Sequence, residues 1–290
     1  MKNKSKFLLG LGAALILPSV SMTRAATMAD VLFVVDESGS MSGEHAWLGS
    51  MVGQLETQLI AAGVTSNQYG LVGYGAGGGS HAVAGHQHTV GGGAFGTAAQ
   101  LSTATGGLVV TGGTEDGWQA ISYALSNYTF RSGAALNVIL VTDEDRDDTS
   151  SDTYATTLAA LVGKSALLNV VVDATYRNGQ QQTSLGIDSL GNAYTADGLG
   201  GYTTTGGGFA SSGFGTTIAD YVNMALATGG AGWDLNQLRA GGLTSDSFTK
   251  AFTDIKVKEI VEQTPDGGTT LAMLGAVLAG LAGLRRKFGA

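Results

Sequence analysis

A carboxylate and two hydroxyl side chains follow directly on an apolar stretch near the start of the chain. Residues 31–35 are continuously apolar, and Asp36, Ser38 and Ser40 come next, separated by single residues. Such a short apolar run is typical of a buried parallel strand, and Gly39 relaxes the backbone of the turn after it. Carboxylate and hydroxyl oxygens are ligands that Mg²⁺ and Ca²⁺ take in proteins. The pattern therefore predicts a divalent-cation site at the end of this strand.

Two later loops carry similar oxygen ligands. One holds Thr114 and Glu115 after a pair of glycines, and the other holds Asp143 shortly after the apolar run 135–141. In open α/β sheets, ligands bind in the crevice beyond the carboxyl ends of the strands. Asp36 and Asp143 both lie at such ends, so we expect them on the same side of the fold.

The remaining elements must position these loops. Residues 167–172 form a third apolar run and residues 69–74 a weaker fourth, while residues 47–59 and 118–125 carry apolar stripes at helical spacing. Strand and helix thus alternate along the chain. This alternation predicts an α/β fold with a doubly wound, mostly parallel central sheet flanked by helices.

Two segments rich in Gly, Thr and Ser, residues 75–96 and 186–215, show little periodicity. We interpret them as long loop insertions within one domain. Residues 217–226 and 247–252 are predicted to be helical, whereas residues 255–260 could continue the last helix or form a strand.

Taken together, the three loops resemble those of the von Willebrand factor A family. The metal-ion-dependent adhesion site of that family combines a DxSxS motif with a Thr on a second loop and an Asp on a third, matched here by Thr114 and Asp143. The resemblance implies a Mg²⁺ site, with Mn²⁺ or Ca²⁺ as alternatives, in which Ser38 and Ser40 bind directly while Asp36 and Asp143 act through waters. It also implies that a vacant coordination position accepts a carboxylate from a partner.

The second loop departs from the simplest family pattern. In the family, the metal-binding Thr is one residue closer to the Ala of the following helix than Thr114 is to Ala120. Glu115 has that shorter spacing to Ala120. A Glu here resembles integrin β-type A domains, in which a carboxylate binds the ion. Such a ligand would hold the cation more tightly but would compete with a partner's carboxylate. We take Thr114 as the first candidate for the metal ligand on this loop and Glu115 as the second.

Each loop also has an interpretation without a metal. Ser38 and Ser40 could cap the helix that contains Trp47, and Thr114 could begin the helix that contains Trp118. Capping would suffice for any one loop alone. The coincidence of three loops favours the metal site.

Three histidines, His81, His86 and His88, lie in the first Gly-rich segment. Their spacing suits Zn²⁺ or Cu²⁺ ligation by imidazole, but no carboxylate is near them in sequence, so they are not assigned to the predicted site. The acidic residues in 144–148 are interpreted as a solvated loop, with a neighbouring Ca²⁺ site as the alternative.

Composition narrows the range of partners. The chain has no cysteine, so disulfides and thiolate ligation of zinc are absent. Its 47 glycines lack the spacing of a collagen helix and indicate loops. Between the basic residues at its two ends, the chain has eight basic and 22 acidic residues. This part therefore carries a net charge of about −14. This charge argues against nucleic acid as a partner, because binding it requires Lys and Arg on the phosphates.

Both ends carry targeting patterns. Residues 1–26 have three lysines, an apolar run and small residues, which is typical of a secretory signal peptide. Residues 264–290 run from Thr-Pro-Asp-Gly-Gly through an apolar stretch to a basic end. They resemble the PEP-CTERM type of bacterial sorting signal in its Val-Pro-Asp-(Ser/Gly)-Gly variant, with Thr264 in place of Val.

That resemblance implies a Gram-negative bacterium and an exosortase-like sorting enzyme as a partner. It also implies contact with the membrane through the C-terminal segment before processing. The A-type domain is then residues 27–263, exported to the cell surface, the outer envelope or an extracellular matrix.

The leading functional hypothesis is a non-enzymatic adhesion or protein-binding domain, whose Mg²⁺ recruits an acidic group on a protein or surface ligand. A structural matrix protein with a stabilising cation is one alternative. A metallohydrolase is another, but no Ser/His/Asp order with a nucleophile elbow and no evident general base support it.

Overall fold

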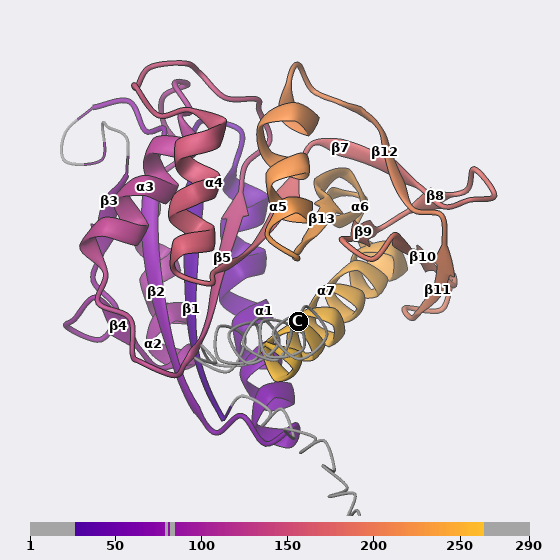
Figure 1. Cartoon of the computed structure of the whole chain (residues 1–290), viewed down its shortest axis with the longest axis horizontal. Coiled ribbons are helices and arrows are strands. Elements are labelled where there is room, and N and C mark those ends of the chain that lie inside the picture. Colours follow the sequence, from indigo (N-terminus) through magenta and orange to yellow (C-terminus); the bar gives the residue numbers. More distant parts are fainter. Residues whose placement is uncertain (1–26, 79–80, 82–84, 264–290) are drawn as a thin grey trace, which may run out of the picture.

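The computed structural model describes residues 27–78, 81 and 85–263, which hold the predicted α/β domain (Figure 1). The predicted signal peptide, residues 1–26, and the predicted sorting segment, residues 264–290, lie outside the described residues. Among the helices that are described, none is long and apolar enough to cross a membrane.

A ten-stranded sheet runs through the middle of the described residues. Its strands are β1 (Met28–Asp36), β2 (Ser66–Tyr74), β3 (His86–His88), β4 (Phe95–Gly96), β5 (Ala135–Val141), β6 (Leu167–Val172), β9 (Gly186–Asp188), β10 (Asn192–Ala196), β11 (Tyr202–Gly206) and β13 (Ala231–Asp234). The central order β2-β1-β5-β6-β13 is parallel, and short antiparallel strands extend it at both edges. Because the order reverses at β1, the topological switch point lies at the carboxyl ends of β1 and β5.

Helices cover both faces of this sheet (Figure 1). They are α1 (Ser42–Ala61), α2 (Ala98–Ala104), α3 (Gly117–Asn127), α4 (Tyr154–Gly163), α5 (Asn223–Ala227), α6 (Leu235–Arg239) and α7 (Gly242–Glu262), with short turns η2 (Thr105–Gly107) and η3 (Ile218–Val222). Helices α1, α2, α6 and α7 share one core, and α3, α4 and α5 the other. In β1, Phe33 faces the first core and Leu32 the second. Burial of both faces explains the continuously apolar run.

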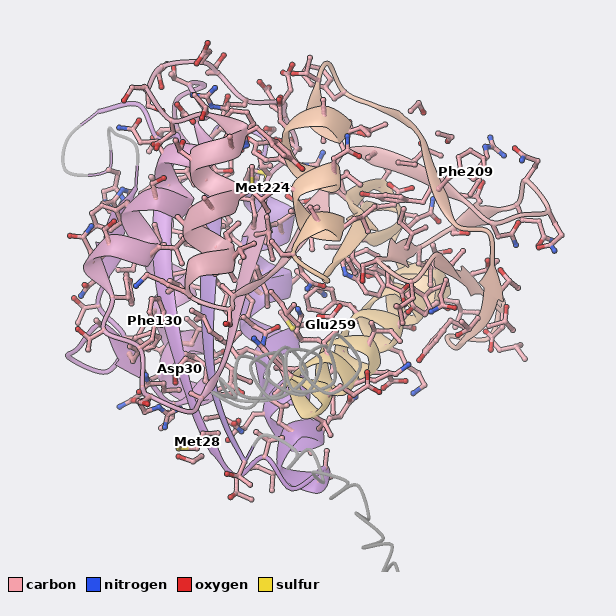
Figure 2. The ribbon with its side chains drawn as sticks, viewed as in Figure 1. Met28, Asp30, Phe130, Phe209, Met224 and Glu259 are labelled. Carbon is pink, nitrogen blue, oxygen red and sulfur yellow. The ribbon has the colours of Figure 1, made fainter. Side chains whose placement is uncertain are left out.

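The doubly wound, mostly parallel sheet predicted from the sequence is confirmed, and its four predicted apolar runs are β1, β2, β5 and β6. The interpretation of the Gly-rich segments as loops is wrong in part. Residues 75–96 contain β3 and β4, and residues 186–215 contain β9, β10, β11 and β12 (Phe209–Gly213), the last pairing with β7 (Ala174–Arg177) and β8 (Thr183–Ser184) in a separate three-stranded sheet. Figure 2 shows Phe209 on this outlying part of the molecule. Strands β11 and β12 are largely exposed, so they lack the apolar alternation that marks a half-buried strand.

Helices α2, α4 and α6 were not predicted from the sequence, although α2 and α4 each begin with a recognisable signal. The side chains of Thr97 and Gln100 form a reciprocal capping box at the start of α2, and Thr153 and Thr156 do the same at the start of α4. The segment left open, residues 255–260, continues helix α7. The predicted helical stretch 217–226 is η3 followed by α5.

Candidate metal centre

The first and third predicted loops meet at the switch point of the sheet. The Ser38 amide donates to Asp36 Oδ1 at 2.7 Å, and the Thr142 hydroxyl donates to Asp36 Oδ2 at 2.8 Å. The Ser40 hydroxyl donates to Asp143 Oδ1 at 3.0 Å and lies 3.4 Å from the Ser38 hydroxyl. Four of the predicted metal ligands are therefore neighbours, because the parallel strands β1 and β5 end at the same edge.

The second loop contributes Glu115 rather than Thr114 to the interior of this site. Glu115 is only 1 % exposed, whereas Thr114 is exposed at the surface. A Cβ atom at Gly75 would lie 2.8 Å from Asp36 Oδ1 and 3.3 Å from Glu115 Cγ. The side chains of Asp36 and Glu115 thus flank the same glycine, whose φ of +83° also disfavours any larger residue.

The capping interpretations do not describe these loops. Helix α1 has Met41 at its N-cap position, with no side-chain hydrogen bond to the cap. Helix α3 is capped by Asp116, whose carboxylate accepts from the Gln119 amide at 3.2 Å. The hydroxyls of Ser38 and Ser40 are therefore available to the cluster at the switch point.

Two of the carboxylates at this site, those of Asp36 and Glu115, lack a basic partner for their charge. Burial raises the pKa of Asp36 to about 7, and the negative charge of Asp143 adds to this effect against opposing hydrogen bonds. Burial also raises the pKa of Glu115 to about 8, with a further contribution from the charge of Asp36. Neither carboxylate oxygen of Glu115 meets the geometry of a hydrogen bond with a described residue, and the contribution of the nearby Ser38 side chain lowers the pKa by less than burial raises it. Such a buried group is costly unless a cation satisfies it, so the residues fit a divalent ion.

Arg239, the last residue of α6, is a neighbour that the sequence analysis did not identify. Its guanidinium donates to Asp143 Oδ2 at 2.8 Å, to the Ser40 carbonyl at 3.2 Å and to Glu44 Oε1 at 2.6 Å. Asp143 is therefore paired with a basic group. Arg239 and Asp143 are 96 positions apart, and no local pattern connects them.

The acidic residues after Asp143 fix the loops to each other. The Glu115 amide donates to Asp147 Oδ2 at 2.9 Å, and the Asp147 amide donates back to the Glu115 carbonyl at 2.7 Å. Asp145 accepts from the Thr216 amide at 3.0 Å. Residues 144–148 are half-buried or exposed. They agree with the predicted solvated loop, and their added function is to hold the second and third loops together.

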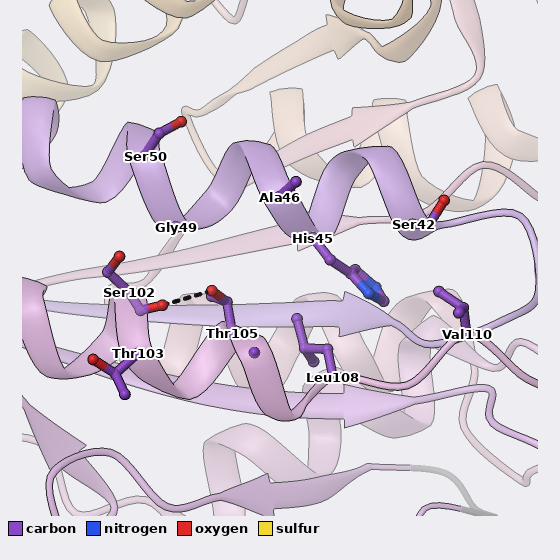
Figure 3. A pocket seen from close by; sticks show the side chains of 11 residues that line it. Ser42, His45, Ala46, Gly49, Ser50, Ser102, Thr103, Thr105, Leu108 and Val110 are labelled. Atoms are coloured by element: carbon purple, nitrogen blue, oxygen red, sulfur yellow. Dashed lines mark hydrogen bonds between the residues drawn. The ribbon is translucent and has the colours of Figure 1, made fainter.

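A groove of about 700 Å³ opens next to the candidate centre, between α1 and the α2–η2 segment (Figure 3). Hydroxyl side chains line much of it, including Ser42, Ser102 and Thr105. Its lining also includes His45, whose Nε2 lies 2.7 Å from the Asp36 carbonyl oxygen. Through His45, the groove therefore adjoins the backbone of Asp36, the first predicted ligand.

His81, His86 and His88 do not join this centre. They surround the carboxylate of Glu37, the residue that follows Asp36. Burial would raise the pKa of Glu37, but hydrogen bonds from His86 and His88 outweigh that effect and lower the pKa to about 2. The sequence analysis missed this carboxylate because 44 positions separate it from His81.

Comparison with known protein families identifies the C-terminal segment. A family model described as the VPDSG-CTERM motif matches residues 265–288. The predicted sorting signal is thus confirmed, and it implies export, association with the cell surface and processing by an exosortase-like enzyme. In its described part, the chain resembles the von Willebrand factor A family, with the DxSxS loop and two further loops at the switch point of a doubly wound sheet.

Similar solved structures include the conserved hypothetical protein BatB from Bacteroides thetaiotaomicron, at 12 % identity over 82 % of this chain and 100 % of that chain, with a TM-score of 0.47. Proximal thread matrix protein 1 from the mussel byssus is 15 % identical over 52 % and 37 %, with a TM-score of 0.38. A von Willebrand factor type A protein from Catenulispora acidiphila is 17 % identical over 50 % and 33 %, with a TM-score of 0.35. No curated protein matches the sequence.

Proposed function

We propose that this chain is an exported, non-enzymatic binding domain of the A type, which uses a bound Mg²⁺ to recruit an acidic group on a protein or surface ligand. The ion would be held by Asp36, Ser38, Ser40, Glu115 and Asp143, with Thr114 as the alternative to Glu115. One observation carries the proposal. Two buried carboxylates, those of Asp36 and Glu115, share a site in which none of the described basic side chains pairs with them.

The charges favour one divalent ion. Arg239 already pairs with Asp143, whereas the carboxylates of Asp36 and Glu115 have no such partner. A single Mg²⁺ would balance these two negative charges, and the oxygen-only donor set is the kind that Mg²⁺ prefers. Mn²⁺ and Ca²⁺ have related preferences and are the alternatives.

The site also supports contact with a partner. Ser40 is exposed, so an ion bound beside it would be reached from solvent. The hydroxyl ligands are neutral, which would leave the ion electrophilic enough to accept a partner's carboxylate in a vacant coordination position. The hydroxyl-lined groove beside α1 would then offer hydrogen bonds to the chain that carries this carboxylate.

A second candidate function follows from the position of Glu115. If its carboxylate binds the ion directly, the site is electrically balanced before any partner arrives, and a further carboxylate adds an unbalanced charge. The cation would then mainly steady the domain, as expected of a structural protein in the cell envelope or the extracellular matrix. Its signature would be a melting temperature that rises with Mg²⁺ in the absence of any partner.

The decisive experiment uses the full-length chain and compares Asp36→Ala with Asp30→Asn. Asp30 is a buried carboxylate on the same strand but at its amino end. We expect Asp36→Ala to abolish calorimetric Mg²⁺ binding and the Mg²⁺-dependent capture of envelope components, and Asp30→Asn to keep both.

Two results would overturn the proposal. One is Mg²⁺ binding that survives Asp36→Ala with unchanged affinity. The other is capture of a partner that is equally strong in chelator and in Mg²⁺. If Mg²⁺ binds and raises the melting temperature but nothing is captured in its presence, the structural function replaces the adhesive one.

A further inference from the structure

A second cluster of ligating side chains lies next to the candidate Mg²⁺ centre but contains different chemistry. Glu37 is completely buried, and its Oε2 lies 2.8 Å from His86 Nε2. Its Oε1 lies 3.2 Å from His81 Nδ1 and 3.3 Å from His88 Nε2. Three of the four histidines of the chain therefore converge on one carboxylate.

The backbone builds this cluster. Strand β3 pairs antiparallel with β2, which places His86 opposite Gly73 and His88 opposite Leu71. Because side chains two residues apart in a strand share a face, both imidazoles point the same way. A Cβ atom at Gly73 would overlap Glu37 Oε2 and lie 2.7 Å from His88 Nε2. The absence of a side chain at Gly73 thus leaves the space that the ligating atoms occupy.

The cluster is compact enough for a tetrahedral metal ion. One donor atom from each of Glu37, His81, His86 and His88 lies within 4.8 Å of all the others, and the Nε2 atoms of His86 and His88 are 3.2 Å apart. Four ligands at zinc–nitrogen distances of about 2.0–2.1 Å would stand about 3.3 Å from each other. The observed separations between the carboxylate and the rings are close to this value.

Hydrogen bonding alone accounts poorly for the cluster. One carboxylate can balance the charge of only one protonated imidazole, yet three rings approach it in a largely buried place. The two Nε2 atoms that face each other can share only one proton. A divalent ion would use all four lone pairs at once.

We propose that Glu37, His81, His86 and His88 form a structural site for Zn²⁺, separate from the oxygen-only Mg²⁺ centre. Imidazole nitrogens suit Zn²⁺, and four protein ligands leave no open position, as in sites that stabilise a fold. The ion would fasten the edge strand β3 and residue 81 to the end of β1.

Glu37 also holds the loop that leads to the Mg²⁺ centre. Its Oε1 accepts from the Val109 amide at 2.8 Å, and its carbonyl accepts from the Thr111 amide at 2.9 Å. The loop continues to Glu115. A Zn²⁺ ion at Glu37 would therefore steady the second loop of the neighbouring centre without contributing a ligand to it.

The test is a calorimetric titration of the full-length, chelator-treated chain with Zn²⁺, followed by Co²⁺ absorption spectroscopy. We expect one equivalent to bind and the Co²⁺ form to show the intense visible bands of a tetrahedral site. His86→Asn and Glu37→Gln should each weaken Zn²⁺ binding at least about tenfold, since even groups that only support a ligand cost that much. His45→Asn, which removes the fourth histidine, and Asp143→Asn should leave the Zn²⁺ affinity unchanged.

Circular dichroism of each variant separates loss of the site from loss of the fold. If Glu37→Gln fails to fold, His81→Asn replaces it, because that side chain is 30 % exposed and its loss leaves no buried cavity. Three results would overturn the proposal: no Zn²⁺ binding, full binding by a folded His86→Asn/His88→Asn double variant, or Zn²⁺ binding that Asp36→Ala abolishes while His86→Asn does not. The Mg²⁺ proposal has its own test, with Mg²⁺ and Asp36→Ala.

Discussion

The two ends of strand β1 hold buried carboxylates in opposite electrostatic settings. At the amino end, labelled in Figure 2, Asp30 accepts from the Arg131 side chain at 2.8 Å and from the Arg131 amide at 2.7 Å. At the carboxyl end, Asp36 accepts from neutral donors only and faces Glu115. Both aspartates are fully buried on the same strand.

This difference distinguishes a buried carboxylate whose charge is balanced within the chain from one whose charge is not. A buried charge is stable when the chain supplies an opposite charge, as Arg131 does for Asp30. Where two acids share a site without such a partner, their pKa values rise and the site favours a cation from solution.

Replacement of Glu115 by Gln tests the carboxyl end most directly. We expect the Mg²⁺ affinity to fall at least about tenfold, because one of the two unpaired charges is lost. Thr114→Val, at the exposed neighbouring position, should change the affinity less. Isothermal titration calorimetry measures both variants, and a larger loss in Thr114→Val would restore Thr114 as the ligand.

The stability of the metal-free protein should decrease as the pH rises from about 4 to about 8. The pKa values of Asp36 and Glu115 are about 7 and about 8 in the fold, against 3.8 and 4.5 ordinarily, so the folded state binds more protons than the unfolded state in this window. Stability therefore falls with pH there. Burial likewise raises the pKa of Asp234, to about 6, so the interval above pH 6 is the most specific.

Urea denaturation in chelator at pH 6 and pH 8 measures this slope. Glu115→Gln should flatten it, and saturating Mg²⁺ should reverse it, because the ion binds the ionised carboxylates. A slope that is the same in the variant and in the unaltered chain would show that Glu115 does not ionise in this range.

At the amino end, Asp30→Asn should destabilise the fold by about 1–3 kcal/mol, since hydrogen bonds from a charged donor are lost. Mg²⁺ affinity should stay the same, because Asp30 and Asp36 lie at opposite ends of β1. Denaturation and calorimetry on one preparation test both statements. A change in Mg²⁺ affinity would mean that the two ends of the strand are coupled.

The smallest effect is expected for Arg239→Gln. Loss of its ion pairs with Asp143 and Glu44 should cost about 1 kcal/mol in chelator, because the guanidinium is partly exposed to water. Mg²⁺ should restore part of this loss, since the freed Asp143 carboxylate then serves the ion. Melting temperatures with and without Mg²⁺ measure the effect, and an equal loss in both conditions would place Arg239 outside the metal centre.

The fold followed from the sequence at the long buried strands, whereas the short buried strands β9 and β13 were not predicted. The apolar runs in β1, β2, β5 and β6 are buried on both faces, so their apolar composition was enough to predict them as strands. In the second Gly-rich segment, β11 and β12 are largely exposed and consist mainly of Thr, Ser and Gly. Such strands are held by backbone pairing, which leaves no periodic trace in the side chains.

For the candidate site, the three loops and their order could be predicted from local patterns, namely the DxSxS motif and the acidic residues at the ends of strands. The sequence left Thr114 and Glu115 as alternatives, and only the packing of the second loop decided which of them is buried beside Asp36. The pairing of Arg239 with Asp143 and the convergence of three histidines on Glu37 likewise belong to the tertiary structure. In each case the sequence specifies which groups carry charge. The distances between charged groups from remote segments are set only when the sheet forms and brings those segments together.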